Sequence, residues 1–458
     1  MRETLVKTEE FEDSPVEKIP KDWEIVSLRN EINILHGYAF KGEYFADEPP
    51  GNVLLVPGNF HRDGGLYFDD NNTKYYRASI PDGTVLENGE LLIVMTDLSP
   101  RTLILGRVVQ LQLPFRVLHN QRIGKIVLKL PDTWDKRFLL LVINSDRVRR
   151  NIISNATGTT VRHTSPDRIL ANLVPKPPVE EQSKIADIFD TIDIAIAHTS
   201  SLIAKLKQMK AGLLHDLLTR GLDENGELRD AIGHPEQFKD SPLGQIPKEW
   251  EVRTMEEITT KIVDGVHKTP VYVESGIPFL TVENLTAGIG ISLKNVRYVT
   301  PSAHAEFFKR ADPRPGDVLV SKDGTLGIAR IVTDDLPEFS IFVSVAQLRP
   351  SEALVLPSFI CTFFETGEYE RQLGHRSAGT GLKHIHLEHF RAFQLAVPPI
   401  AEQHRISKVL NSHDIRIRTE EAYRDKLKLQ KKGLMHDLLT GKVRVKDVDK
   451  FTSASDTV

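Results

Sequence analysis

The sequence contains a single cysteine, Cys361, which excludes an internal disulfide and any metal site built from several cysteines. It has no apolar run of about 18 residues, so no membrane-spanning helix is predicted. The first residues, MRETLVKTEEFED, are acidic and polar and are not typical of a signal peptide. From these absences we expect a soluble, cytoplasmic protein.

An excess of positive charge is also missing. The chain has 59 lysines and arginines against 63 aspartates and glutamates, a formal net charge of −4. Proteins that bind DNA by themselves usually carry a basic surface, because much of their affinity comes from neutralising phosphates. The overall balance therefore argues mildly against nucleic acid as a partner, unless charge is segregated or partner subunits supply the positive surface.

Motifs for catalysis are absent as well. No GxxxxGK[ST] phosphate loop is present, so no nucleotide-driven motor is predicted. No lysine has an acidic residue two positions before it, as a PD-(D/E)xK nuclease would need. The nearest match to the (D/N)PP turn of an adenine methyltransferase is Asp47-Glu48-Pro49-Pro50, which lacks the aromatic residue and is interpreted as a surface turn. We therefore expect no catalytic residue and no cofactor.

One histidine cluster has the spacing of a metal site. His384, His386 and His389, with Glu388, could in principle bind zinc or another transition metal. The corresponding positions earlier in the chain keep only His163. We interpret the cluster as polar contacts near the start of the next element and expect no metal.

What the chain does contain is a long predicted helix over residues 179–218. Apolar or small residues recur there at alternating steps of three and four, which is the seam of a coiled coil. Two prolines precede the helix and Gly221 follows it, as is typical of helix ends. The predicted seam consists of Ile185, Ile188, Ile192, Ala195, Thr199, Leu202, Leu206, Met209 and Leu213.

The sequence of this helix and of its surroundings occurs twice. PPVEEQSKIADIFD at 177–190 recurs as PPIAEQHRISKVLN at 398–411, and KLKQMKAGLLHDLLT at 205–219 recurs as KLKLQKKGLMHDLLT at 426–440. An opening segment, FEDSPVEKIPKDWE at 11–24, recurs as FKDSPLGQIPKEWE at 238–251. The second helix is expected to keep its seam at Ile406, Val409, Tyr423, Leu427 and Leu434, with interruptions at His413, Arg416 and Glu420.

The duplication predicts an α+β architecture with internal pseudo-two-fold symmetry. Two β-rich mixed globular domains are separated by two long helices, which pair as an antiparallel coiled coil. The expected boundaries are 11–176 for the first globular domain, 177–220 for the first spacer helix, 221–237 for a linker, 238–397 for the second domain, 398–441 for the second helix and 442–458 for a frayed tail.

These duplicated motifs resemble the specificity subunit of type I restriction–modification systems, over nearly the whole chain. The resemblance is carried by DSPxxxIPKxW, by the turns Gly158-Thr159 and Gly379-Thr380, by PPxxEQxxI and by KLKxxKxGLxHDLLT. Loop segments similar to this family are PGNFHRDGG at 57–65, LHNQRIG at 118–124, DGVHKTP at 264–270, GIPFLTVENL at 276–285 and GDVLVSKDGTLG at 316–327.

The resemblance implies a protein that is not an enzyme by itself. Each globular domain would be a target recognition domain that reads one half of a split, asymmetric site in double-stranded DNA. The helices would set the gap between the half-sites and dock two adenine-methylating modification subunits and the restriction subunits, which translocate DNA. A non-catalytic coiled-coil scaffold, an orphan DNA-binding protein and a stand-alone nuclease or methyltransferase remain as alternatives.

Polar and basic residues in the family-like loops are the candidates for contact with DNA, because such side chains reach base edges and phosphates. They are Asn59, His61, Arg62, Asn120, Gln121, Arg122, Thr160 and Arg162 in the first domain, and His267, Lys268, Asn284, Lys322, Thr325 and Lys383 in the second.

Overall fold

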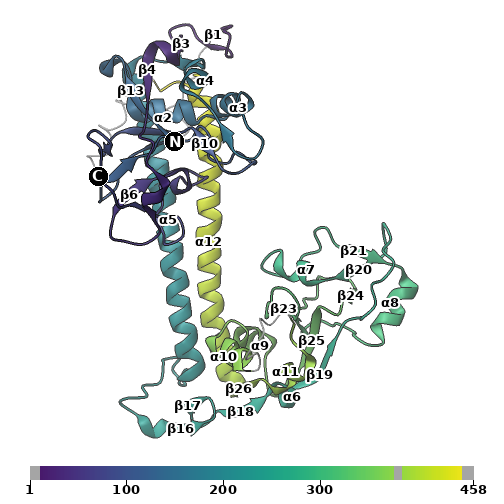
Figure 1. The fold of residues 1–458 in the computed structure, drawn as a ribbon. Helices are drawn as coiled ribbons and strands as arrows, with labels where there is room; N and C mark the ends of the chain where they lie inside the picture. The colour runs from purple at the N-terminus through teal and green to yellow at the C-terminus, as the bar shows by residue number, and fades with distance from the viewer. Residues whose placement is uncertain (1–10, 376–383, 446–458) are drawn as a thin grey trace, which may run out of the picture. The chain divides into compact units, whose positions relative to one another are not determined.

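A computed structural model describes residues 11–375 and 384–445 of the chain. The chain forms two compact units: unit 1 comprises residues 1–200 and 422–458, and unit 2 comprises residues 201–421. The two long helices, α5 (Val179–Thr219) and α12 (Ile400–Leu439), each contribute one half to each unit (Figure 1). Among the described residues, no helix has both the length and the apolar character needed to cross a membrane.

Unit 1 is built on two sheets. A four-stranded sheet has the order β11-β9-β13-β4, and a five-stranded sheet has the order β5-β7-β6-β12-β8. The strands are β4 (Ile32–His36), β5 (Phe45–Ala46), β6 (Asn52–Leu55), β7 (Lys74–Tyr76), β8 (Val85–Leu86), β9 (Leu91–Val94), β11 (Val108–Gln110), β12 (Val117–His119) and β13 (Ile123–Leu128). Strand β9 is buried along its whole length, as expected for a run of four large apolar residues.

Short pairs and helices complete unit 1. The opening segment forms the antiparallel pair β1 (Phe11–Glu12) and β2 (Ile19–Pro20). β3 (Glu24–Ser27) pairs with β15 (Leu173–Lys176), and β10 (Thr96–Asp97) pairs with β14 (Arg162–His163). The helices are α1 (Leu28–Glu31), α2 (Lys136–Asn144), α3 (Asp146–Ser154) and α4 (Pro166–Leu170), and single 3₁₀ turns occur at Gly42–Tyr44, Pro57–Asn59 and Pro131–Thr133.

Unit 2 repeats this plan. Its sheets have the orders β19-β25-β22-β23 and β21-β20-β24. The strands are β19 (Thr259–Asp264), β20 (Ile277–Leu280), β21 (Arg297–Val299), β22 (Val318–Ser321), β23 (Ala329–Ile331), β24 (Ser340–Ile341) and β25 (Val345–Pro350), with the pairs β16 (Phe238–Ser241) and β17 (Gly244–Pro247), and β18 (Glu251–Thr254) and β26 (Gln394–Val397). The helices are α6 (Met255–Ile258), α7 (Val282–Thr286), α8 (Pro301–Phe308), α9 (Pro357–Phe363), α10 (Gly367–His375) and α11 (Leu387–Ala392), and Pro235–Gln237 forms a 3₁₀ turn.

The long helices are antiparallel in each unit. In unit 1 the start of α5 and the end of α12 share one core, through Phe189 and Leu438. In unit 2 the end of α5 and the start of α12 share another core, through Leu217 and Ile406. The α+β fold with two β-rich domains and paired helices is thus confirmed, and each half of the helix pair belongs to the core of one domain.

A buried carboxylate joins these elements in unit 1. Glu181, in the first turn of α5, accepts a hydrogen bond from the Trp23 indole at 3.1 Å. The Arg444 guanidinium, which is 1% exposed, contacts both carboxylate oxygens of Glu181 at 2.6 and 2.7 Å, and it also pairs with Asp22 at 2.7 Å. The ionised groups are therefore buried but fully paired, which is the condition for their burial to be tolerated.

The same arrangement recurs in unit 2. Glu402 of α12 accepts from the Trp250 indole at 3.1 Å and from Arg229 at 2.6 and 3.1 Å. In each unit the arginine comes from the segment that follows the other long helix: Arg444 follows α12, and Arg229 follows α5. The tryptophan of the opening motif and the glutamate of the PPxxEQ motif are thus two parts of one contact.

The glutamine of the PPxxEQ motif holds the start of an earlier helix of the same unit, α2 or α9, against the long helix. Gln182 accepts a hydrogen bond from the Asp135 amide at 2.9 Å and donates to the Pro177 carbonyl at 2.8 Å. Gln403 makes the matching bonds, with the Leu356 amide at 2.9 Å and the Pro398 carbonyl at 2.8 Å. Both glutamines are fully buried, so the motif positions α2 and α9 against the long helices.

The predicted seam is correct in part. Ile185, Thr199 and Leu206 are buried as expected, whereas Met209 and Tyr423 are each 50% exposed, so these two assignments were wrong. Lys210 is mostly buried and lies 2.7 Å from both Asp414 and Glu365. Burial lowers the pKa of Lys210, but the two carboxylates together raise it by a larger amount, so the net shift is upward.

At the place where we expected the second seam to be interrupted, the buried positions of α12 move by one residue. Arg416 is exposed, and its neighbour Ile417 is buried seven residues after Leu410. The seam then continues through the half-buried Arg424 to Leu427. A heptad step therefore bridges the polar stretch that appeared to break the pattern.

The tail also differs from expectation. We predicted a frayed segment after Gly441, yet Arg444 and Val445 are buried in unit 1. Gly441 makes this possible, because its φ of 68° is in the left-handed region and a Cβ there would lie 2.4 Å from Pro20. Gly221 has the same role after α5, with a φ of 67°.

Substitution of Arg444 by alanine should destabilise unit 1. The change leaves the buried Glu181 without its charged partner, and loss of one member of a buried ion pair costs about 3–5 kcal/mol. Unfolding of unit 1 can be followed by the fluorescence of Trp23 and Trp134. Unfolding of unit 2 can be followed by the fluorescence of Trp250 in a variant in which the other two tryptophans are replaced. Lys442→Ala, at an exposed position in the same segment, is the control and should change stability by less than about 0.5 kcal/mol. Equal midpoints for the two variants would contradict the role of Arg444.

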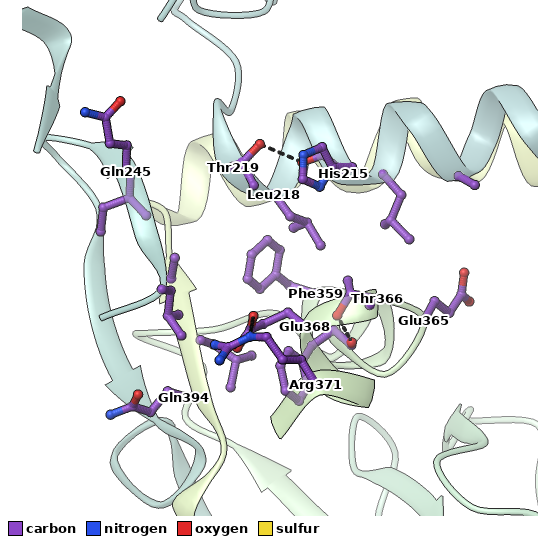
Figure 2. A pocket seen from close by; sticks show the side chains of 18 residues that line it. His215, Leu218, Thr219, Gln245, Phe359, Glu365, Thr366, Glu368, Arg371 and Gln394 are labelled. Atoms are coloured by element: carbon purple, nitrogen blue, oxygen red, sulfur yellow. Dashed lines mark hydrogen bonds and ion pairs between the residues drawn. The ribbon is translucent and has the colours of Figure 1, made fainter. Parts of the chain in front are cut away.

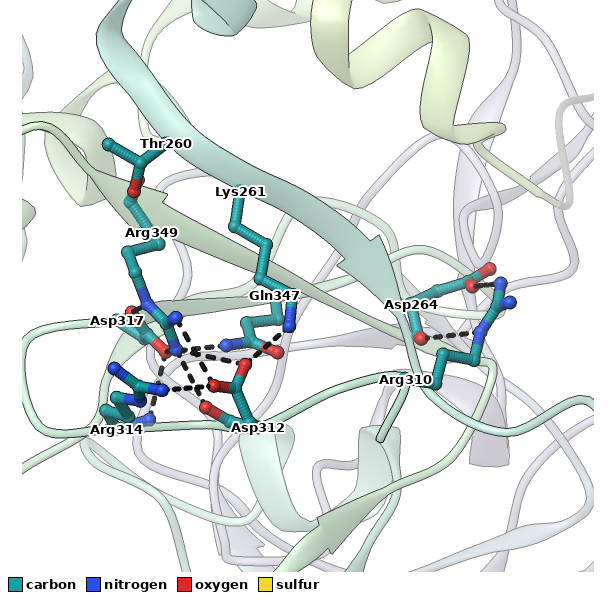
Figure 3. Close-up of polar contacts among 9 residues, drawn as sticks. All are labelled: Thr260, Lys261, Asp264, Arg310, Asp312, Arg314, Asp317, Gln347 and Arg349. Atoms are coloured by element: carbon teal, nitrogen blue, oxygen red, sulfur yellow. Dashed lines mark hydrogen bonds and ion pairs between the residues drawn. The ribbon is translucent and has the colours of Figure 1, made fainter. Parts of the chain in front are cut away.

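A second ionic network crosses the four-stranded sheet of unit 2 (Figure 3). Asp317 contacts Arg349 at 2.9 Å and accepts from Gln347 at 2.6 Å. Asp312 pairs with Lys261 and lies 3.2 Å from Arg349. Burial raises the pKa of Asp312, but the hydrogen bonds from Lys261 and Arg349 lower it more strongly, so it stays well below its usual range.

The stability of unit 2 should therefore fall in acid. Because the folded-state pKa of Asp312 is depressed, its contribution is full well above the ordinary aspartate value of 3.8 and is lost as the pH falls below that value. Asp312→Asn removes this contribution, which is about 1.5–3 kcal/mol for hydrogen bonds to charged groups. Urea midpoints of the wild type and the variant should differ at pH 7, and the difference should begin to shrink between pH 3.8 and pH 3, although it disappears only near the depressed folded-state pKa. A constant difference across this range would contradict the assignment.

Candidate nucleic-acid interface

Each unit contains two neighbouring parallel strands, which lead into the predicted contact loops in unit 1 and, in unit 2, into the segment of Asn284 and the segment 342–344, which holds no predicted contact residue. In unit 1, β6 and β12 are parallel, with Leu54 opposite Leu118. In unit 2, β20 and β24 are parallel, with Phe279 opposite Ser340. The carboxyl ends of parallel strands meet at one edge of a sheet, which is a common place for a binding site. The loops after β6 and β12, and those after β20 and β24, are thus brought together.

At each of these edges a third segment packs closely against the other two, and a glycine makes the close contact possible. A Cβ on Gly37 would lie 2.3 Å from the Asn120 carbonyl oxygen, and one on Gly265 would lie 2.0 Å from the Ile341 carbonyl oxygen. The Gln121 amide donates to the Tyr38 carbonyl at 3.0 Å. The backbones approach so closely that only glycine fits, which places the segments after β4 and β19 beside the two loops.

The GT turn lies against the loop that follows β9. Thr96 Oγ1 lies 3.0 Å from Nδ1 of His163, within the β10–β14 pair. Asp97 is buried and accepts hydrogen bonds from the amides of Ser99 and Ile104 at 2.8 Å. Arg162 donates to the Gly158 carbonyl at 3.0 Å and closes the turn. Both segments are therefore held by groups of the protein itself.

The matching place in unit 2 holds a buried lysine. Lys322 is 2% exposed, and its Nζ lies 3.2 Å from His384 Nε2 and 3.5 Å from Asp264 Oδ2. Asp264 also contacts Arg310, and it lies 3.1 Å from His267. Burial raises the pKa of Asp264, but the hydrogen bonds from Arg310 and His267 and the charge of Lys322 produce a net lowering. The carboxylate is thus held ionised beneath the loops.

Two asparagines that we predicted to contact DNA are part of the framework. Asn59 accepts from the Val56 amide at 2.8 Å and donates to the Asn72 carbonyl at 3.1 Å. Asn284 accepts from the Thr281 amide at 2.8 Å and donates to the Ser292 carbonyl at 2.9 Å. Both are buried at equivalent positions, so their amides shape the loop after the strand.

The remaining predicted residues fall into three groups. The exposed ones, whose contact with DNA stays a prediction, are His61, Arg62, Gln121, Arg122, Thr160, His267, Lys268 and Thr325. Asn120 is buried, with its side chain bonded to the Arg122 amide at 3.0 Å, and Arg162 is half buried. Lys383 and the second GT turn, Gly379-Thr380, lie outside the described residues.

Sequence reasoning missed two residues at these edges. Tyr38 is exposed beside Gln121, and its position after Gly37 matches the segment after Gly265, so aligning the two halves could have found it. Arg310 follows α8 and belongs to no repeated motif, so only the fold brings it to Asp264.

The histidine cluster does not form a metal site in the part of the chain that the structure describes. The rings of His384 and His386 have centroids 4.6 Å apart, and those of His386 and His389 are 5.6 Å apart. No group of three or more His, Cys, Asp or Glu side chains there is placed to hold an ion. His384 instead contacts Lys322 and Asp323.

Two equivalent sheet edges in one chain define a class of duplicated protein, in which each unit carries its own copy of the same loop framework. The chain belongs to the family described as "Type I restriction modification DNA specificity domain", which matches residues 20–208 and 247–429. The match covers both units, as the duplication predicts.

Relatives across almost the whole length are specificity subunits. The chain is 23% identical over 450 residues to the type I restriction enzyme MjaVIII specificity subunit of Methanocaldococcus jannaschii, covering 97% of this chain and 98% of the relative. It is 25% identical over 395 residues to the EcoBI specificity subunit of Escherichia coli, covering 85% of this chain and 78% of the relative. The protein is therefore a non-catalytic DNA-recognition subunit.

Solved structures share the fold. The S subunit of a type I system from M. genitalium has a TM-score of 0.54 at 15% identity and covers 91% of this chain and 96% of its own. A chain from a study of assembly and conformational transition in the type I system has a TM-score of 0.55 at 14% identity, with coverage of 93% and 99%.

The buried and exposed candidates should behave differently when they are substituted. Lys322→Ala removes a partner of the buried Asp264 and should cost about 1–3 kcal/mol in stability. Arg62→Ala, at an exposed position, should change stability by less than about 0.5 kcal/mol while weakening methylation of the cognate site. Thermal unfolding, together with methylation by the reconstituted complex, checks both results. Wild-type stability of Lys322→Ala would refute its framework role, and wild-type methylation by Arg62→Ala would remove that residue from the interface.

Proposed function

We propose that each unit reads one half of a bipartite, asymmetric DNA site within a type I restriction–modification complex. In this proposal α5 and α12 set the gap between the half-sites and, together with the units, dock the modification and restriction subunits. The observation that carries it is one sheet edge built twice with different side chains.

The framework of the two edges is shared and their exposed surfaces are not. Asn59 and Asn284 make matching bonds, and Gly37 and Gly265 make matching close approaches. Next to them, the exposed Gln121 and Arg122 follow β12, whereas Val343 and Ser344 lie at those places before β25. Two edges of one design with different side chains favour recognition of two different short sequences.

Association with partners accounts for the acidic net charge. Modification and restriction subunits, the former in two copies, would supply part of the positive surface along DNA. Two readers on one chain turn two weak contacts into one strong one, because the second contact becomes intramolecular. A methylating partner must also take its adenine out of the base stack, which requires a duplex held at a defined position.

The test is a single-molecule map of N6-methyladenine in the host genome, with and without the gene. We expect deletion to remove methylation at one motif made of two short half-sites around a fixed gap. If the purified complex with its modification subunits methylates no such motif, the proposal is wrong.

Substitutions in the two units should affect different half-sites. Arg122→Ala should relax discrimination in one half-site and Lys268→Ala in the other, by about 1–3 kcal/mol for each lost base contact. A library in which both half-sites are randomised, methylated by the reconstituted complex and then sequenced, measures this. Lys136→Ala, at an exposed position on α2, is the control and should leave both half-sites unchanged. Relaxation of the same half-site by both variants would contradict one reader per unit.

A further inference from the structure

Each unit contains a pocket at the end of a long helix, away from the sheet edges. The unit 2 pocket, of about 430 Å³, lies between the end of α5, the β16–β17 pair, α9, α10 and β26 (Figure 2). The unit 1 pocket, of about 570 Å³, lies between the end of α12, α2, α3 and β15. Neither pocket includes a residue that we assigned to DNA.

The two pockets are the same site built twice. Every residue that lines the unit 1 pocket, except Glu17, has a lining counterpart in unit 2 at an offset of 221 positions. Four pairs are identical in residue type: Arg150 and Arg371, His436 and His215, Leu439 and Leu218, and Thr440 and Thr219.

The shared chemistry of the pockets is an apolar floor with a polar mouth. In unit 2, Leu218 faces Phe359 across the pocket, with His215 and Arg371 on opposite sides (Figure 2). The other charged residues differ, because Arg147 and Lys432 in unit 1 replace Glu368 and Ala211 in unit 2. A phosphate backbone would need positive charge in both pockets, so DNA does not fit as the common ligand.

A glycine beside each pocket points to an external partner. Gly212 and Gly433 lie in the interior of long helices, where glycine costs roughly 0.5–1 kcal/mol relative to alanine. A Cβ at either position would meet no described atom within 4 Å, so no contact within the described chain requires glycine. In a helix, a residue three positions earlier lies on the same side, so each glycine is next to the histidine at the pocket mouth.

One exposed apolar side chain lies beside the unit 1 glycine. Leu429 is 71% exposed and lies one turn before Gly433, on the side of α12 that leads to His436 and the pocket. The histidines are exposed, so packing inside the protein does not explain why both units keep them. A small residue between an exposed apolar side chain and a pocket allows a partner's main chain to approach closely.

We propose that each pocket binds one copy of the modification subunit, which inserts an apolar side chain and brings its main chain against Gly212 or Gly433. This rests on the proposed function, in which two modification subunits assemble with the chain. One site built in duplicate fits two copies of one partner. Restriction subunits and a second copy of this chain are alternative occupants that the experiment separates.

The test places a larger side chain at the two glycines, where the described chain itself leaves space for it. Gly212→Leu and Gly433→Leu are made singly and together, mixed with purified modification subunit, and examined by native mass spectrometry. At a concentration that just saturates the wild type, each single variant should lose most of one modification subunit, and the double variant should lose most of both. Titration should show about thirtyfold weaker binding at the altered site, as for loss of an interface hot spot.

Three controls make the outcome decisive. Gly42→Leu adds the same bulk at an exposed glycine outside the pockets and should keep both partners. Thermal unfolding of the glycine variants should match or exceed that of the wild type, because leucine favours helix. His215→Trp and His436→Trp block the mouths from exposed positions, and they give a second readout that does not depend on the helix glycines.

If the double glycine variant and the double tryptophan variant each still bind two modification subunits, the inference is wrong. So would a dimer of this chain that only the glycine variants disrupt. Methylation of a bipartite motif by the wild-type complex is measured in parallel. If that methylation is present while both double variants bind normally, the pocket inference fails and the proposed function stands; if the wild-type complex methylates no bipartite motif, the proposed function itself fails.

Discussion

The structure depends on one interaction that occurs twice, a buried glutamate shared by a tryptophan and an arginine. Glu181 and Glu402 begin the long helices, and Trp23 and Trp250 begin the globular folds. Burial of each carboxylate is tolerated because a guanidinium pairs with it and an indole N–H completes its hydrogen bonds. Each contact fixes the direction in which the start of a long helix leaves its globular domain.

The arginine of each contact explains why the repeats are interdependent. Arg229 follows α5 and completes the contact of α12, while Arg444 follows α12 and completes the contact of α5. Each unit therefore consists of one globular domain, the start of its own helix and the end of the other helix. The units are compact, but neither corresponds to one sequence repeat.

The duplication made the fold class, both long helices and most of the seam predictable from sequence alone. Met209 and Tyr423 were misassigned because an apolar residue at the right spacing was preferred to its charged neighbour. Lys210 pairs with Asp414 across the interface instead, and Arg424 is the half-buried residue next to Tyr423. Charged pairs across a helix interface depend on residues more than 200 positions away, which periodicity does not reveal. Lys322 lies in a loop as predicted, whereas Asn59 lies in a 3₁₀ turn and Asn284 in α7; the burial of all three depends on strand pairing that a linear motif does not encode.

The crossed arginines also bear on the order of events during synthesis. Unit 2 is one continuous segment, residues 201–421, and includes both Arg229 and Glu402. Its core can close while the remaining residues are still being translated. The Glu181 contact, in contrast, has to wait for Arg444, near the end of the chain. At about 5–20 residues per second, the first domain spends on the order of tens of seconds on the ribosome without its last partner. The N-terminal globular domain is made first and completed last.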